Sequence, residues 1–228
     1  MLSEPNLAIL TVFTPTLLAL IISSISGGKK ALRALFINQT FKNVGLKWIS
    51  LSLFVFPILG SLAMLSSSKF DFSQFELRTT QLLPQIIIIV LIGFGEEYGW
   101  RGFLQSKINK KTNVLNASLL VGFIWGLWHF PAYMIGTGVP LEMHFGIFII
   151  WVLLASLFIG WIYYKTGNVL TSVLAHISAN ATFNYLVILP EFTGSMETFS
   201  YFMLFLFIMV GFIFYRYRDD LVKLKRSE

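Results

Sequence analysis

Two adjacent carboxylates at the end of a long apolar run constrain this chain more than any other feature. The run 82–94 contains no charged residue, and it continues into Gly-Glu-Glu-Tyr-Gly-Trp-Arg at 95–101. A run of this length is typical of a membrane-spanning helix. Placing an ionised side chain at bilayer depth costs about 2.5–3.5 kcal/mol on insertion scales, so acids in such a segment are candidate functional groups.

Helical geometry assigns different roles to the two acids. Glu97 and Arg101 are four residues apart, so they face each other on a helix and can neutralise one another. Glu96 lies about 100° further round the helix and is not matched by that pair. The spacing therefore predicts that Glu97–Arg101 is a structural ion pair and that Glu96 is the acid available for chemistry. The alternative is that these charges only lock helices together.

The composition is that of a polytopic membrane protein. Of 228 residues, 56% are hydrophobic and 12% are charged, and the mean hydropathy is +0.74. The net charge is +6, but the basic residues cluster between apolar segments, which favours membrane topology over nucleic-acid binding. There is no cysteine, which excludes disulfides, thiolate nucleophiles and cysteine-ligated metals. The first six residues contain no Lys or Arg, so we expect a retained span rather than a cleaved signal peptide.

The hydropathy pattern predicts one all-α membrane domain over residues 1–228, a polytopic transmembrane helical bundle of about seven spans. Each span is long enough to cross a hydrocarbon core of about 30 Å at about 1.5 Å per residue. Residues 82–189 form the core that carries the motifs described below. The expected spans are 7–26, 45–66, 82–104, 115–134, 145–164, 169–189 and 199–215.

The basic residues predict the orientation of these spans. With the N-terminus outside, the outer segments contain only Lys69 and Arg78, and Arg101 is intramembrane. All other Lys and Arg residues then fall in cytoplasmic segments, including the C-terminal tail. This asymmetry predicts an outside N-terminus and a cytoplasmic C-terminus. Residues 29–47 mix basic and apolar side chains, which predicts a short amphipathic helix on the cytoplasmic surface.

Few other groups capable of chemistry lie at membrane depth. The fourth span carries His129, and the sixth carries His176 and Asn180, which share one helix face because they are four residues apart. Counting about 1.5 Å per residue from the span ends places these groups and Glu96 in the cytoplasmic half or the middle of the bilayer. A lone intramembrane histidine more often makes an interhelical hydrogen bond, but this convergence favours a site. His144 is expected at the outer interface.

This set of side chains suits hydrolysis by an activated water. An acid and a histidine from different helices can hold and deprotonate a water molecule. A second histidine with an asparagine one turn on can donate to a developing oxyanion. No Ser or Cys has an evident base partner, so a covalent nucleophile is not favoured. Hydrolysis of a carbonyl compound, above all of a peptide bond, is therefore the predicted reaction.

Zinc is the main competitor within this scheme. Glu96, His129 and His176 would supply the three ligands of a catalytic zinc that keeps one position for water. The HExxH signature of zinc peptidases is absent from the sequence. We therefore expect no cofactor, with these three residues as the ligands if a metal is bound.

Taken together, these elements resemble the CAAX prenyl endopeptidase type II family, also called the CPBP or Abi family of intramembrane proteases. The family's EExxxR motif is matched at 96–101, and its HxxxN motif at 176–180. Its FxxxH motif is matched at His129, with Trp125 where the family usually has Phe. The resemblance implies that Glu96 and His129 activate water without a metal. It also implies that His176 and Asn180 stabilise the oxyanion. The residues with supporting roles are then Glu97, Arg101 and Trp125.

The resemblance also implies the setting of the reaction. The expected partners are the lipid bilayer and a membrane-associated protein or peptide substrate, with no nucleic acid. Because the chain is short, cysteine-free and rich in Lys, Ile and Phe, the expected location is the plasma membrane of a prokaryote. Two other functions stay open: a catalytically silent bacteriocin-immunity or scaffold protein, and a proton-coupled transporter. A transporter predicts inverted repeats, which the sequence does not display, and cleavage activity separates the remaining two.

Overall fold

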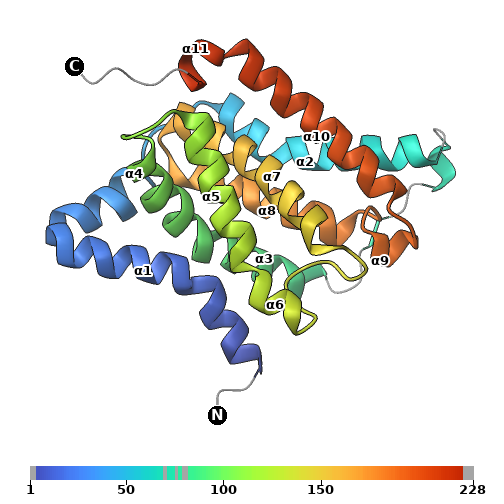
Figure 1. Ribbon diagram of the computed structural model, residues 1–228, viewed down its shortest axis with the longest axis horizontal. Coiled ribbons are helices and arrows are strands. Elements are labelled where there is room, and N and C mark those ends of the chain that lie inside the picture. The colour runs from blue at the N-terminus through green and yellow to red at the C-terminus, as the bar shows by residue number, and fades with distance from the viewer. Residues whose placement is uncertain (1–3, 69–70, 75–76, 79–81, 223–228) are drawn as a thin grey trace.

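The computed structural model describes residues 4–68, 71–74, 77–78 and 82–222, and the elements of regular secondary structure in them are helices joined by turns and loops (Figure 1). Within these residues, pairing of extended backbone is limited to one antiparallel bridge between Leu77 and Leu186. The predicted all-α class is therefore confirmed. The helical segments are α1 (Glu4–Arg33), η1 (Ala34–Asn38), α2 (Leu46–Ser67), η2 (Phe72–Gln74), α3 (Leu82–Glu97), η3 (Tyr98–Gln105), α4 (Ser106–Ile108), α5 (Val114–Trp128), α6 (Phe130–Met134), α7 (Phe145–Thr166), α8 (Val169–Tyr185), α9 (Pro190–Thr193), α10 (Glu197–Arg216) and α11 (Arg218–Leu221).

Five stretches of helix among the described residues are long and apolar enough to cross a membrane. They correspond to five of the seven predicted spans: Thr11–Asn38, Leu46–Ser67, Val114–Met134, Phe145–Thr166 and Glu197–Arg216. The other two predicted spans are also helical. Residues 82–104 form α3 and most of η3, and residues 169–189 contain α8, which has 17 residues and ends at Tyr185. The count of seven spans stays a prediction, as does the orientation of the termini.

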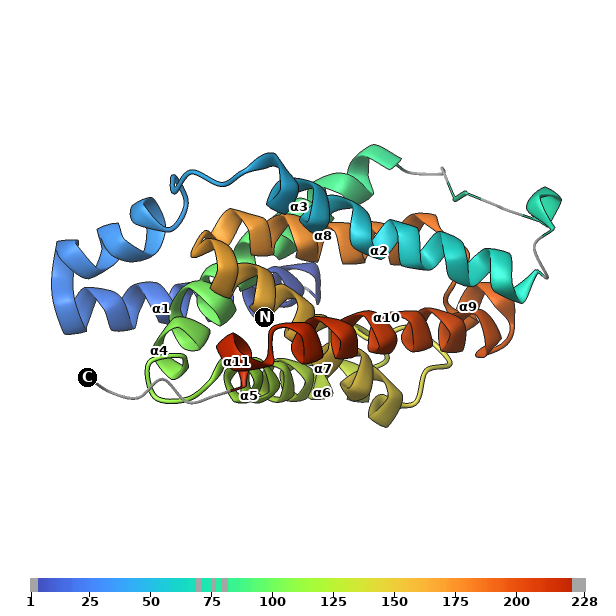
Figure 2. The ribbon, with the colours of Figure 1, turned by 90° about the horizontal axis from the view of Figure 1, so that it is seen from above.

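Helix α7 lies at the centre of the bundle. It is the most buried of the five candidate spans, and it packs against α5 on one side and α8 on the other. Helix α8 in turn packs against α2 and α3, while α10 covers α2 and α7. Figure 2 shows α2, α3 and α8 as one layer and α5, α7 and α10 as a second. Helix α1 lies at one edge, against α3 and η3.

Aromatic side chains fill the space between α2, α7 and α10. Phe56, Phe158 and Phe202 are fully buried. The ring of Phe56 meets those of Trp151 and Phe158 edge-on, with centroids 5.8 Å and 5.4 Å apart, and the centroid of Trp151 lies 5.5 Å from that of Phe202. Such pairs add favourable contacts beyond the burial of their area. This core holds α2 and α10 against α7.

Helix α1 does not end where the first predicted span ends. Gly28 has φ 52° and ψ −144°, a conformation that favours glycine, and it kinks the helix. Beyond the kink the chain stays helical to Asn38 and turns back toward the bundle (Figure 2). A helical segment therefore occupies part of the predicted amphipathic stretch, with Leu35 buried. Its position at the cytoplasmic surface stays a prediction.

The segments between helices gather at two ends of the bundle. At one end, the Asn168 side chain donates to the carbonyls of Thr40 and Lys42, and Lys165 pairs with Asp220 over 2.8 Å. At the other end, the amide of Leu141 donates to Glu191, and the amide of Arg78 donates to the carbonyl of Tyr185. The first end contains loops predicted to be cytoplasmic, and the second contains loops predicted to be outside.

Candidate active site

The two acids lie where an α-helix becomes a π-helix. Helix α3 ends at Glu97, and the chain continues without interruption into the π-helical segment η3. Such wider turns occur frequently at functional sites. Two side-chain contacts between residues four apart cross this transition. Trp100 donates to Glu96, and Arg101 donates to Glu97.

Glycines allow neighbouring helices to approach this segment closely. A Cβ atom on Gly99 would overlap the backbone carbonyl of Pro15 in α1, and one on Gly93 would lie 2.9 Å from Ile177 Cγ1 in α8. Small residues are common where helices approach closely in membranes. Because α1 and α8 contact α3 and η3 at these points, the acids are held at a fixed place between helices.

Glu97 lies at the centre of a buried charge cluster. Its Oε1 pairs with Arg101 Nη1 at 2.9 Å, and neither side chain is exposed. The same Oε1 accepts a hydrogen bond from His176 Nδ1 at 2.8 Å. The guanidinium carbon of Arg101 lies 4.8 Å from the centroid of the Trp125 ring, within the range of a cation–π contact. The predicted ion pair is present, and it also binds one of the two candidate histidines.

Glu96 is held by two indole groups instead of a cation. Its Oε2 accepts a hydrogen bond from Trp125 Nε1 at 2.6 Å and a longer one from Trp100 Nε1 at 3.3 Å. Its Oε1 accepts no hydrogen bond from any described residue. Glu96 is 4% exposed, so it is almost completely removed from solvent. The predicted separation of Glu96 from the Glu97–Arg101 pair is therefore seen in the side-chain contacts.

His129 lies at the break between α5 and α6. Helix α5 ends at Trp128, and Pro131 occupies the first turn of α6, where its missing N–H does no harm. His129 Nδ1 lies 2.8 Å from the carbonyl oxygen of Trp125. A carbonyl oxygen only accepts, so Nδ1 carries the proton, and in the neutral ring Nε2 is left as an acceptor. The His129 ring also packs against Phe148 of α7, with centroids 5.0 Å apart.

His176 and Asn180 lie one turn apart on α8, as predicted, but only His176 is tied to the acids. The His176 ring lies 5.1 Å from the Trp125 ring, centroid to centroid. The Asn180 carbonyl accepts from the Asn184 side chain, whereas the Asn180 side chain makes no hydrogen bond to the described residues. Asn180 is half-buried. These contacts thus bring α3, α5 and α8 together around Trp125, and they do not include the side chain of Asn180.

Trp125 contacts four of the predicted site residues, namely Glu96, Arg101, His129 and His176. We expected it to act through packing beside His129. The donation from its N–H to Glu96, and the participation of Trp100, were not predicted. The signal in the sequence was the spacing of Trp100, four residues after Glu96, as Arg101 is after Glu97.

No group of three or more His, Asp or Glu side chains that could hold a metal ion occurs among the described residues. The three residues expected as ligands if a metal is bound each use one atom for another contact: His176 Nδ1 on Glu97, Glu96 Oε2 on the indoles and His129 Nδ1 on the Trp125 carbonyl. Glu96 Oε1 and the Nε2 atoms of both histidines make no hydrogen bond to a described residue. The expectation that no metal takes part stays a prediction.

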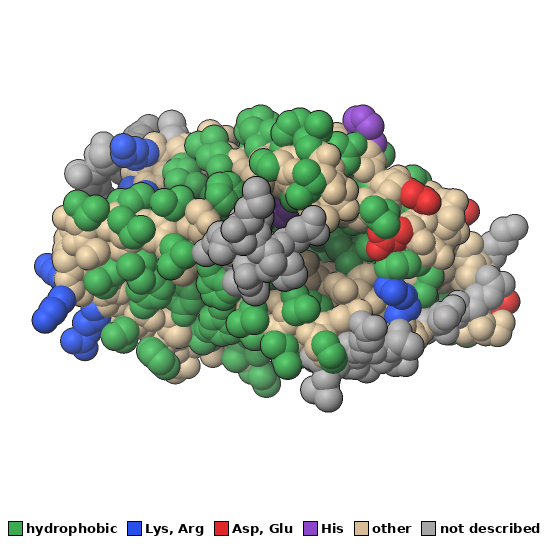
Figure 3. Space-filling view, turned by 90° about the horizontal axis from the view of Figure 1, so that it is seen from below, with side chains coloured by type: hydrophobic (Ala, Val, Ile, Leu, Met, Phe, Trp, Pro, Cys, Tyr) green, Lys and Arg blue, Asp and Glu red, His purple; other side chains and the backbone are tan. Residues whose placement is uncertain are grey.

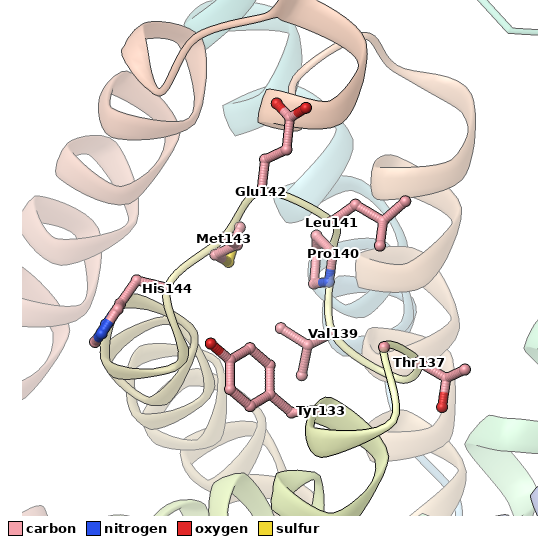
Figure 4. A pocket seen from close by; sticks show the side chains of 9 residues that line it. Tyr133, Thr137, Val139, Pro140, Leu141, Glu142, Met143 and His144 are labelled. Carbon is pink, nitrogen blue, oxygen red and sulfur yellow. The ribbon is translucent and has the colours of Figure 1, made fainter.

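The face seen from below in Figure 3 is hollowed near its centre, and a histidine side chain is visible inside the hollow. The loop before α7 lies close to the site, since a Cβ atom on Gly138 would be 4.0 Å from His129 Cδ2. This loop encloses a cavity of about 300 Å³ (Figure 4), which none of the predicted catalytic residues lines. His144 lines that cavity and is exposed, and its Nδ1 caps α7 by accepting from the Gly146 amide.

Comparison with known proteins identifies similar sequences. Residues 78–182 match the family model described as type II CAAX prenyl endopeptidase Rce1-like. The resemblance predicted from the three motifs is thereby confirmed over this segment, which contains every predicted site residue.

Two curated relatives are similar over different lengths. The chain is 27% identical over 179 residues to CAAX prenyl protease 2 of Methanococcus maripaludis, a match that covers 72% of this chain and 66% of that protein. It is 34% identical over 84 residues to lysostaphin resistance protein A of Staphylococcus haemolyticus, covering 35% of this chain and 23% of that protein. The chain therefore spans slightly less than two thirds of the first relative and about a quarter of the second.

Proposed function

We propose that this chain, whose residues 78–182 match the type II CAAX prenyl endopeptidases, is an intramembrane endopeptidase of the CAAX type. It hydrolyses a peptide bond of a membrane-associated protein or peptide with an activated water. The observation that carries this proposal is the buried acid Glu96, whose Oε1 accepts no hydrogen bond from a described residue. The rings of His129 and His176 both contact Trp125, which donates to the other oxygen of Glu96.

Glu96 and His129 together activate the water. Glu96 Oε1 accepts one water proton, and His129 Nε2 accepts the hydrogen bond from the other O–H. The fixed Nδ1–H of His129 supports this role, because it leaves Nε2 with a lone pair in the neutral ring. Positioned general bases of this kind contribute about 10²–10⁴-fold to a rate.

His176 and Asn180 stabilise the oxyanion that forms when the water attacks the carbonyl carbon. As a donor at Nε2, His176 must be the imidazolium, because Nδ1 already donates to Glu97. Ionised Glu96 and Glu97 then balance Arg101 and His176, so the four buried charges sum to zero. That balance supports the assignment, since an uncompensated buried charge is costly.

The substrate is expected to lie within or against the lipid bilayer, because five of the described helices are suited to crossing a membrane. The relative from Methanococcus maripaludis is named CAAX prenyl protease 2. For this chain we propose the broader class, a membrane-associated protein or peptide, at the plasma membrane of a prokaryote. Glu97, Arg101 and Trp125 support the reacting groups.

A catalytically silent protein that confers resistance or immunity is the alternative function. The staphylococcal relative carries a resistance name, but the match covers 23% of that protein. A silent protein would have no use for an acid with one oxygen left without a partner. The two functions are separated by testing whether the purified protein cleaves membrane-associated peptides and whether Glu96→Gln abolishes the cleavage.

A further inference from the structure

We infer that Trp125, assisted by Trp100, is a positioning residue that selects which oxygen of Glu96 handles the proton. This inference rests on the proposed function and extends it to two groups that would act through Glu96. It follows from three observations: where the indole N–H groups point, what they can donate to, and what they leave free.

Both indoles meet the same carboxylate oxygen. Trp125 Nε1 lies 2.6 Å from Glu96 Oε2, and Trp100 Nε1 lies 3.3 Å from it. The two side chains come from different helices, α5 and η3, and they are 5% and 6% exposed. Hydrogen bonds from a neutral donor to a carboxylate are short and comparatively strong, and the 2.6 Å distance is at the short limit. The carboxylate of Glu96 is therefore fixed in orientation from two sides.

The chemistry of indole makes this arrangement directional. An indole N–H donates and has no lone pair to accept with. The two N–H groups engage both lone pairs of Oε2, so a proton taken up by Glu96 goes to Oε1. We call the two indole hydrogen bonds to Glu96, from Trp125 and Trp100, the indole clamp. The clamp assigns Oε1 to proton transfer and Oε2 to structural support.

The hydrolytic step balances with this assignment. Water gives one proton to Glu96 Oε1 while its oxygen forms a bond to the carbonyl carbon. Collapse of the tetrahedral intermediate breaks the C–N bond, and the proton on Oε1 passes to the leaving nitrogen. The products are a carboxylic acid and an amine, and Glu96 returns to its ionised state.

Trp125 contacts its neighbours in the site through both its backbone carbonyl and its indole N–H, and the two contacts can be separated by substitution. Its backbone carbonyl accepts from His129, whereas its indole donates to Glu96. Trp125→Phe keeps the first contact and an aromatic ring, and it removes the N–H. Phe is also the residue that the family motif usually has at this position.

The test compares three substitutions of Trp by Phe in purified enzyme with a cleavable membrane peptide. Trp125→Phe is expected to lower kcat by about 10- to 100-fold with little change in KM, as for the loss of one hydrogen bond to a charged group. Trp100→Phe, which loses the longer bond, is expected to lower kcat less. Trp161→Phe is the control, because this indole is 6% exposed and its N–H has no acceptor among the described residues. It should leave kcat unchanged.

A spectroscopic measurement tests the clamp independently of activity. The carboxylate stretch of Glu96 is identified in the infrared spectrum as the band that Glu96→Gln removes. That band should shift in Trp125→Phe and stay in place in Trp161→Phe. If Trp125→Phe fails to fold, the same comparison is made with benzothienylalanine at position 125, which keeps the shape of indole and lacks the N–H.

Two results would overturn the inference. One is a kcat for Trp125→Phe equal to that for Trp161→Phe, and the other is an unshifted carboxylate band. If the wild-type protein cleaves no peptide but the band shifts, the proposed function fails while the clamp on Glu96 stands.

Discussion

His176 Nδ1 donates to Glu97 Oε1 across 2.8 Å, on the oxygen that also pairs with Arg101. The ion pair therefore orients a candidate functional group as well as neutralising a charge. Because the carboxylate can only accept, His176 Nδ1 carries a proton, and Nε2 makes no hydrogen bond to a described residue. Glu97 thus connects the structural role predicted for it with the site around Glu96.

Glu97→Gln should damage both folding and activity. The substitution leaves Arg101 buried and unpaired, which costs about 3–5 kcal/mol when a buried pair loses one partner. It also removes the charge that holds His176. Thermal unfolding in detergent should therefore show a lower Tm, together with reduced cleavage.

Glu96→Gln is the matched control for that experiment. Its amide oxygen can still accept from the indoles, so expression and Tm should stay near wild-type values while cleavage is abolished. The roles of the two acids would be reversed if Glu96→Gln unfolds the protein and Glu97→Gln does not.

The sequence predicted the parts of the site that depend on spacing along one helix. The Glu97–Arg101 pair and the shared face of His176 and Asn180 follow from helix periodicity alone. The donation from His176 to Glu97 does not follow from it, because the contact depends on how α8 crosses α3. The indole clamp on Glu96 is a contact of the same kind, since Trp125 reaches it from α5.

The hydropathy pattern predicted which segments are helical better than it predicted where the helices bend and end. Most expected spans agree with a helix to within a few residues, because apolar length is a direct signal. The kink at Gly28 and the early end of α8 depend on local backbone geometry and on packing at the helix ends. Hydropathy does not report on either of these.

Gly99→Ala should destabilise the fold. A Cβ atom at this position would overlap the Pro15 backbone, which cannot move as a flexible side chain could, so α1 would have to separate from η3. The loss of stability is expected to be about 1–3 kcal/mol, as for other overpacked sites. Gly211→Ala in α10 is the control, because a Cβ atom there meets nothing within 4 Å. It should stabilise slightly through helix propensity, and equal Tm values for the two variants would contradict the close approach of α1.

The C-terminal tail should be cytoplasmic and the loop before α7 should be outside. The prediction follows from the positions of Lys and Arg along the chain. Reporter fusions after Lys225 and within residues 136–140 should report opposite sides of the membrane. Fusions reporting the same side would contradict the predicted arrangement of spans.

Activity should not depend on a tightly bound metal. We expect Glu96 and His129 to supply the general base between them, so that water is activated without a metal. Elemental analysis of active enzyme should find no stoichiometric zinc, and exhaustive chelation should leave the rate unchanged. Stoichiometric zinc, with activity lost on chelation and restored by zinc, would make Glu96, His129 and His176 ligands.

Removal of an oxyanion donor should leave residual activity. Asn180→Ala is expected to lower kcat by about 10²–10³-fold, the usual effect of losing one such donor. The side chain of Asn180 is half-buried and bonds no described residue, so Tm should change little. A large loss of Tm with unchanged kcat per folded molecule would indicate a structural role instead.

The central claim is that Glu96 drives peptide-bond hydrolysis within the membrane. The most direct measurement is mass spectrometry of membrane-associated peptides incubated with purified wild-type protein, Glu96→Gln and Trp161→Phe in lipid vesicles. The account predicts that defined cleavage products, with one oxygen from ¹⁸O-labelled water in the new carboxyl group, appear with the wild type and Trp161→Phe and are absent with Glu96→Gln. Products that form equally with Glu96→Gln, or peptides that stay intact with folded wild-type protein across the substrate set, would contradict it.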